Sequence, residues 1–261
     1  MTGRAAMRVL VTRPAAQSQE WLRRLHAAGI DAVALPLISI APLADLAPLH
    51  AAWPGLAQRR MLMFVSPNAA EQFFAARPAG AAWPAGLIAA SPGPGTTRAL
   101  QSLGVPAAQI VAPALEAPQF DSEALWARLS AMPWQGAEVL IVRGESGRDW
   151  LAQRLRDSGA RVDELAVYRR GPPVWDDAEQ RICAEALQDP RGHLWWFSSS
   201  EAIDRLAERA AGDWPAARAL ATHPRIAARA RHLGFGEVLQ ARPTADEVMA
   251  AIRRSLQSRP L

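Results

Sequence analysis

The chain has 261 residues, of which 50% are hydrophobic, and a net charge of +4. This length suits two domains of roughly 100–150 residues or one large domain. No apolar run approaches the roughly 20 residues of a membrane span, and the first apolar run is too short for a signal peptide, so we expect a soluble cytoplasmic protein.

The cysteine and the cationic residues indicate the cellular compartment and the kind of ligand. Cys183 is the only cysteine, which excludes an internal disulfide and fits a reducing compartment. All 29 cations are arginines, a bias typical of a GC-rich genome, and they form no basic block of five or more. Nucleic-acid binding is therefore not indicated, and planar guanidinium groups favour an acidic small molecule as ligand. The five histidines lack the spacing of a metal site.

The first predicted element is a buried aliphatic strand in RVLVTRP, from Arg8, and it is followed by a loop opening on Arg13. An amphipathic helix ending near Gly29 and a second strand, DAVALPLI from Asp31, come next. Two further strand-to-helix junctions follow, MFVSPNAA (63–70) and SPGPGTT (91–97). This alternation predicts βαβ units.

The same series then returns, mostly at an offset of 130 residues. EVLIVRG from Glu138 matches RVLVTRP, and RVDELAVY from Arg161 matches DAVALPLI. WFSSSEAI (196–203) and ATHPRIA (221–227) match the two later junctions. Two domain-sized copies predict an α/β protein with two similar flavodoxin-like domains, each a parallel sheet flanked by helices.

Two strand-like segments ended by proline lie at equivalent places in the copies, PLISIAP (36–42) and VYRRGPP (167–173). Both are candidate linkers, and two connections imply that one domain is inserted in the other. In parallel sheets ligands lie beyond the carboxyl ends of the strands. That rule selects the loops that begin at Arg13, Ser66, Gly93, Arg143, Ser198 and Thr222.

The turn from Gly93 to Thr97 leads directly into a helical pattern. Gly95 lets backbone N–H groups approach an anion at a helix start. The alternative is an ordinary capped turn with Thr96 or Thr97 as N-cap. The Gly-Lys-Ser/Thr ending of a P-loop is missing.

Small polar residues close two other strands. Ser66-Pro67-Asn68 and Ser198-Ser199-Ser200 either cap the following helices or offer hydroxyl and amide groups to a ligand. No Gly-x-Ser-x-Gly sequence surrounds these serines, so a hydrolase triad is not indicated.

Three further residues are candidates from their position. Arg13 and Arg143 follow strands and can grip a carboxylate, although Arg143 can equally pair with Glu145 or a helix-face acid. Tyr168 is the only tyrosine, and alone it fits a half-buried strand residue with a wet edge. Strand alternation places Arg170 on its side.

The ordered set of motifs resembles the uroporphyrinogen-III synthase family over nearly the whole chain. The matching segments are VLVTRPAAQ, LHAAGI, PLISI, FVSPNA, GPGTT, VLIVRGESGRDWL, LRDSGARV, VYRR, FSSSEAI and HPRIAARARHLGF. The chain departs from the family at THPRI (222–226), where many members have Gly and Thr, and Thr222 is a candidate substitute.

The resemblance implies two α/β domains, 1–37 with 172–261 and 38–171, joined by a two-stranded linker. The substrate would be hydroxymethylbilane, held in the cleft between the domains without a cofactor. A transient contact with the preceding pathway enzyme is also expected.

Site roles also follow from the resemblance. It gives Tyr168 the role of general acid, at the mouth of the cleft and not in a core, and gives Thr96, Ser66 and Ser199 substrate-binding roles. Gly95, Asn68, Ser198 and Thr222 complete these loops, and Arg13 and Arg143 are added from strand-end position alone.

Two other protein classes are alternatives. A two-domain glycosyltransferase would carry a Glu- or His-rich nucleotide motif late in the chain, and none is seen. A small-anion binding protein of the periplasmic type would need an export signal, for which the N-terminus is too polar.

Overall fold

A computed structural model describes residues 7–257. Two segments lie outside the described residues. They are residues 1–6, which belong to the N-terminus expected to be no signal peptide, and residues 258–261, which end the first predicted domain. The chain divides into two compact units, which are described separately. Unit 1 contains the residues up to Ser39 and those from Gly171 onward, and unit 2 is Ile40–Arg170.

Unit 1 is built on a five-stranded sheet in the order β11-β10-β9-β1-β2, with all neighbouring pairs parallel. Its strands are β1 (Arg8–Val11), β2 (Ala32–Ala34), β9 (His193–Phe197), β10 (Arg218–Ala221) and β11 (Glu237–Gln240). Its helices are α1 (Ala15–Ala27), α7 (Asp177–Gln188), α8 (Ser200–Arg209), η3 (Trp214–Ala216), α9 (Pro224–Leu233) and α10 (Ala245–Gln257).

Alternate residues of each unit 1 strand face different helices. Val9 and Val11 pack with Leu25 of α1 and Ile252 of α10, and all four are fully buried. Leu10, between the two valines, is equally buried on the other face, where α8 and α9 lie against the sheet. Burial on both faces explains why these strands are continuous apolar runs.

Unit 2 is built on a six-stranded sheet in the order β3-β8-β7-β4-β5-β6. Its strands are β3 (Ser39–Pro42), β4 (Met61–Phe64), β5 (Ile88–Ala90), β6 (Ile110–Val111), β7 (Glu138–Gly144) and β8 (Arg161–Gly171). Its helices are α2 (Ala47–Ala52), η1 (Trp53–Gln58), α3 (Pro67–Ala75), α4 (Pro94–Ser102), η2 (Ala107–Gln109), α5 (Ser122–Leu129) and α6 (Trp150–Asp157). The four pairs from β8 to β6 are parallel.

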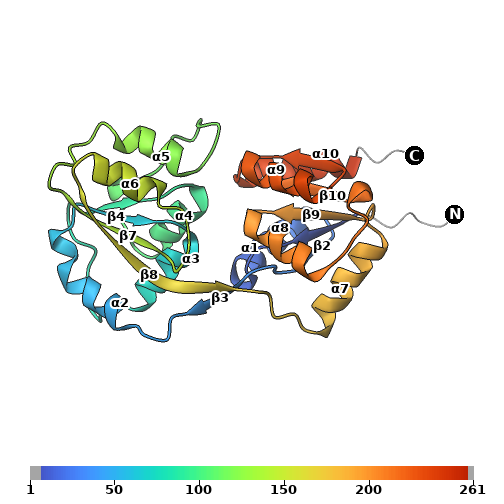
Figure 1. Cartoon of the computed structure of the whole chain (residues 1–261), viewed down its shortest axis with the longest axis horizontal. Coiled ribbons are helices and arrows are strands. Elements are labelled where there is room, and N and C mark those ends of the chain that lie inside the picture. Colours follow the sequence, from blue (N-terminus) through green and yellow to red (C-terminus); the bar gives the residue numbers. More distant parts are fainter. Residues whose placement is uncertain (1–6, 258–261) are drawn as a thin grey trace. The chain divides into compact units, whose positions relative to one another are not determined.

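Two separate cores cover the faces of the unit 2 sheet. Leu62 and Phe64 of β4 face a cluster formed with η1, α3 and α4. Met61 and Met63, the alternate residues of the same strand, face the cluster formed with α5 and α6. In Figure 1 the strands of unit 2 accordingly run between helices. The predicted α/β class, with parallel sheets flanked by helices, is confirmed.

The two sheets share one strand order. Unit 1 reads β2-β1-β9-β10-β11 and unit 2 reads β8-β7-β4-β5-β6, so both follow the flavodoxin-like order 2-1-3-4-5. Each sheet therefore joins the first two strands of one sequence copy to the last three strands of the other. Within residues 7–257, no helix is long and apolar enough to cross a membrane.

Candidate functional site

The strand order fixes where a ligand is expected in each unit. In a parallel sheet of this type, successive strands are added to one side of the first strand and then, from the third strand on, to its other side. A crevice opens beyond the carboxyl ends of the first and third strands, where this order reverses. In unit 1 these strands are β1 and β9, which end before Arg13 and Ser198. In unit 2 they are β7 and β4, which end near Gly144 and Ser66.

In unit 2 the structure brings Ser66 and Tyr168 together. Ser66 is the N-cap of α3, and its Oγ accepts a hydrogen bond from the Ala69 N–H at 3.2 Å. The same Oγ lies 3.1 Å from the Tyr168 hydroxyl oxygen. Arg170 donates from Nη2 to that phenol oxygen at 3.2 Å, and its guanidinium carbon lies 5.8 Å from the ring centroid. The prediction that Arg170 shares the side of Tyr168 is confirmed.

Tyr168 itself is fully buried in a core, so the expectation that it lies outside a core is wrong, and so is the alternative of a half-buried strand residue with a wet edge. The side chain is 0% exposed and belongs to the core cluster that contains Phe64 and Val142. Its register partner in β7 is Gly144, which follows an irregularity in the pairing. A Cβ on Gly144 would lie 2.9 Å from Tyr168 Cε2, so the glycine backbone covers the ring.

The turn before α4 differs from its predicted capping. The N-cap is Gly93, with Pro94 as the first helical residue, so the alternative with Thr96 or Thr97 as N-cap is wrong. The Thr97 hydroxyl bonds the Gly93 carbonyl at 3.2 Å. Thr96 is 3% exposed, and its hydroxyl has no hydrogen-bond partner within residues 7–257.

The starts of α3 and α4 lie side by side. A Cβ on Gly95 would lie 3.6 Å from Pro67 Cγ. Asn68 is the second helical residue of α3, directly after Pro67. Two helix N-termini, each with unsatisfied backbone N–H groups and a partial positive charge, thus share one edge of the unit 2 sheet.

In unit 1, Arg13 lies beside a pair of tryptophans whose ring centroids are 4.5 Å apart. Its guanidinium carbon is 5.8 Å from the Trp21 ring and 5.6 Å from the Trp196 ring, and Nη1 donates to Gln17 Oε1 at 3.3 Å. The stacking fixes the guanidinium plane beside the end of β1.

The loop after β9 carries Ser198 and Ser199. Ser199 has the extended backbone of an N-cap, but its side chain makes no capping hydrogen bond to α8. N-capping therefore accounts for the Ser66 hydroxyl and does not account for that of Ser199. Within the described residues, the Ser199 hydroxyl has no partner.

The loop after β10 contains a cap that the sequence reasoning missed. Thr222 is 6% exposed, and the next residue, His223, is the N-cap of α9. His223 Nδ1 accepts from the Arg225 N–H at 3.1 Å. The available signal was Pro224, because proline favours the first helical position and so marks the residue before it as the cap.

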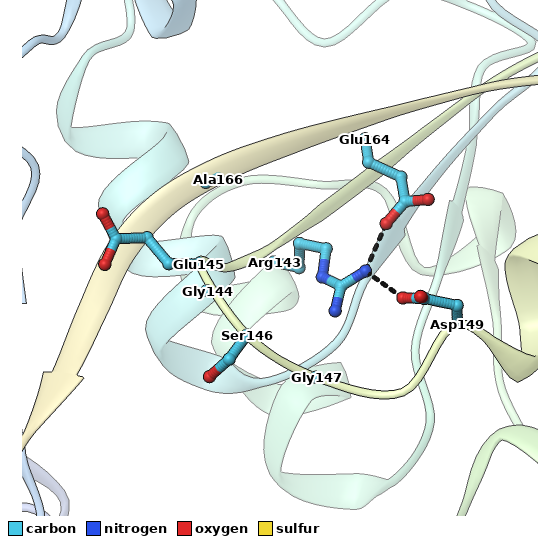
Figure 2. A pocket seen from close by; sticks show the side chains of 8 residues that line it. All are labelled: Arg143, Gly144, Glu145, Ser146, Gly147, Asp149, Glu164 and Ala166. Atoms are coloured by element: carbon cyan, nitrogen blue, oxygen red, sulfur yellow. Dashed lines mark hydrogen bonds and ion pairs between the residues drawn. The ribbon is translucent and has the colours of Figure 1, made fainter.

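Arg143 lies in an ion-pair cluster. Its Nη1 lies 2.5 Å from Asp149 and also contacts the Glu164 carboxylate, and its side chain is 13% exposed. Burial lowers the pKa of this guanidinium, but the hydrogen bonds to Asp149 and Glu164 outweigh burial and hold the pKa above its ordinary value. Figure 2 shows Glu145, one of the alternative partners considered for Arg143, pointing away from it.

These residues line a pocket of about 430 Å³ that also contains Gly144, Ser146 and Gly147. Its three carboxylates outnumber its one guanidinium, which disfavours an anionic occupant. The described residues, those of this pocket included, contain no group of three or more His, Cys, Asp or Glu side chains that could hold a metal ion.

Comparisons with known proteins agree on one family. Residues 19–250 match the family model of Uroporphyrinogen-III synthase HemD. A uroporphyrinogen-III synthase of Proteus mirabilis is 32% identical over 167 residues, which is 63% of this chain and 80% of that protein.

Two solved structures share the fold. A mutant uroporphyrinogen III synthase of Thermus thermophilus has a TM-score of 0.62 at 19% identity, covering 97% of this chain and 100% of that one. The synthetase of Helicobacter pylori has a TM-score of 0.59 at 14% identity, with coverage of 97% and 100%. Since the family model spans most of the sequence and the Proteus relative supports it, this chain belongs to the uroporphyrinogen-III synthase family.

Proposed function

We propose that this protein closes hydroxymethylbilane, a linear tetrapyrrole bearing acetate and propionate groups, to uroporphyrinogen III. In this reaction ring D is inverted and water is lost, which makes the enzyme a hydro-lyase. The observation that carries the proposal is the family match over residues 19–250. The reaction neither oxidises nor reduces its substrate, so its chemistry calls for no redox cofactor.

The chemistry demands positioning more than strong catalytic groups. The ring A pyrrole expels its hydroxymethyl oxygen to give an azafulvene once a proton reaches the departing hydroxide. Attack by the substituted carbon of ring D gives a spiro intermediate, and its fragmentation and reclosure invert the ring. Attack through the free α-carbon, which needs no enzyme, gives the symmetric isomer I. The enzyme must therefore select the attacking carbon by holding the chain.

In unit 2, the paired starts of α3 and α4 are suited to holding substrate carboxylates. Backbone N–H groups at the first turns can donate to an anion, and the helix partial charge favours it. The absence of a side chain at Gly95 allows close approach to the backbone. We assign substrate contacts here to Thr96, Asn68 and Ser66, supported by the unpartnered Thr96 hydroxyl among the described residues.

In unit 1, the corresponding loops supply a guanidinium and hydroxyl groups. Arg13, held by its two tryptophans, is suited to a planar, bidentate carboxylate contact. We assign further contacts to Ser198, Ser199 and Thr222. Ser199 is supported by its lack of a capping role, because an N-cap serine without a cap bond has its hydroxyl available for a ligand.

Two predicted roles need separate treatment. Tyr168 is proposed as the source of the proton for the leaving hydroxide, since a positioned phenol hydroxyl can act as a general acid. Arg143 is proposed to hold the loop after β7 and not to bind substrate, because its Nη1 already pairs with both Asp149 and Glu164.

The test is to incubate purified protein with enzymatically made hydroxymethylbilane and to separate isomers III and I. Excess isomer III is expected, and unchanged spontaneous formation of isomer I would refute the proposal. Neither the glycosyltransferase nor the small-anion binding protein is favoured by the family match.

The cellular setting is also a proposal. A single, buried cysteine suits a reducing compartment, so we propose the cytoplasm. Because the substrate closes spontaneously to the wrong isomer, direct transfer during a transient contact with the preceding pathway enzyme would be useful.

A further inference from the structure

The fully buried position of Tyr168 raises the question of how its proton reaches a substrate. The phenol has 0% exposure, and the Gly144 backbone lies against its ring. A bound tetrapyrrole could not touch the phenol oxygen without displacing part of the unit 2 core. Ser66, by contrast, is only partly buried and stands where β4 ends and α3 begins.

The hydrogen bonds around the phenol determine which way its proton points. An arginine side chain has only donors, so the phenol oxygen must accept from Arg170 Nη2 at 3.2 Å. The phenol proton in turn needs an acceptor, because a buried unsatisfied donor is costly. Among the described residues the acceptor within reach is Ser66 Oγ, at 3.1 Å. Tyr168 therefore donates to Ser66.

The Ser66 hydroxyl then still has its own proton to donate. A hydroxyl oxygen accepts two hydrogen bonds, and these come from Tyr168 and from the Ala69 N–H. Its own proton cannot point back at either donor, so it is available to a third partner. We propose that Ser66, and not Tyr168, transfers the proton to the substrate, and that Tyr168 replaces the proton that Ser66 has given up.

The relay rests on the proposed function. It takes up as many protons as it releases during one reaction cycle. As the C–O bond of the hydroxymethyl group breaks, the hydroxide takes the Ser66 proton and leaves as water. Ser66 takes the Tyr168 proton in the same event, and the Arg170 guanidinium stabilises the phenolate. When ring D regains its aromaticity, its free α-carbon loses a proton, which returns through Ser66 to Tyr168. Tyr168 is thus a positioning and proton-storing residue, and Ser66 is the catalytic residue.

The test compares four single variants, one double variant and one control for kcat with hydroxymethylbilane and for the ratio of isomers III and I. Tyr168→Phe removes the stored proton and Ser66→Ala removes the relay. Ser66→Asn keeps a capping oxygen for α3 without a hydroxyl, and Ser66→Thr keeps both cap and hydroxyl. Asp121→Ala is the matched control, because it removes the side-chain cap of α5 in the same unit.

The relay predicts that Tyr168→Phe, Ser66→Ala and Ser66→Asn each lower kcat by roughly 10²-fold or more and release more isomer I. The double variant Ser66→Ala with Tyr168→Phe should be no slower than either single one, because both act in one step. Ser66→Thr should restore most of the rate, and Asp121→Ala should keep the wild-type kcat.

Near-normal kcat in Ser66→Asn with a slow Tyr168→Phe would overturn the relay, as would multiplicative losses in the double variant. Both results would leave the proposed function intact, since wild-type protein would still make isomer III. Wild-type protein that makes only isomer I would instead refute the proposed function itself.

Discussion

Replacing Gly144 by alanine tests the contact that covers Tyr168. The new methyl carbon would lie 2.9 Å from Cε2, 3.0 Å from Cζ and 3.3 Å from the hydroxyl oxygen of Tyr168. Carbon atoms in contact normally sit about 3.5–4.0 Å apart, so the ring must give way by about 0.5 Å or more. Because the ring is fully buried, overpacking of this kind costs about 1–3 kcal/mol of unfolding free energy.

The same displacement should affect catalysis. A shift of the ring stretches the 3.1 Å contact between Tyr168 and Ser66, so we expect kcat to fall by about tenfold or more. Urea unfolding followed by circular dichroism measures the stability, and the isomer assay measures the rate.

Gly55→Ala is the control, since nothing lies within 4 Å of its added methyl group, and it should change neither quantity appreciably. In a Tyr168→Phe background, Gly144→Ala should still cost stability, because two of its three close atoms are ring carbons that phenylalanine keeps. Wild-type stability together with a wild-type rate in Gly144→Ala would refute this reasoning.

Three other substitutions separate structural from binding roles. Ser199→Ala should raise the KM for hydroxymethylbilane while leaving the free energy of unfolding within about 0.5 kcal/mol of wild type, because no cap bond is lost. Arg143→Met should lower the urea midpoint, since Asp149 and Glu164 both lose Arg143 and Glu164 keeps only Arg156, while KM stays near wild type. A KM rise without destabilisation would instead make Arg143 a substrate ligand. The hydrogen bond from Arg242 lowers the pKa of Glu247 in the folded protein. This carboxylate therefore stabilises the fold at pH values above the ordinary glutamate pKa of about 4.3. The stabilisation is lost as the pH falls through the lowered pKa of the folded protein. Glu247→Gln should flatten that part of the stability curve, measured by urea unfolding from about pH 6 to pH 3.

The fold class could be predicted because its signals are local. RVLV and EVLIV are continuous aliphatic runs, which are typical of strands in parallel sheets that helices cover on both faces. The structure buries nearly all of these residues. The cap of α4 was also readable, because Pro94 marks Gly93 as the N-cap, but the preference of threonine for caps pointed elsewhere.

Burial and ion pairing at the site depend instead on strand register. Tyr168 is covered because an irregular pairing sets Gly144 opposite it, and no pattern in either strand announces that irregularity. Arg143 reaches Glu164 across two paired strands, whereas the sequence offered as alternatives Glu145, its neighbour along the chain, or a helix-face acid. The roles of the individual site residues stay predictions until the variants above are measured.

The shared strand order has a consequence for how such a chain could have arisen. A single copy contains all five strands of one sheet, so it could close on itself or trade its last three strands with a second copy. The present chain corresponds to the traded form, a domain-swapped pair fused end to end. Fusion raises the effective concentration of each copy for the other, which makes the trade permanent at any protein concentration. A chain cut in the loop between β6 and α5 would lose that advantage, and each fragment would be free to fold alone.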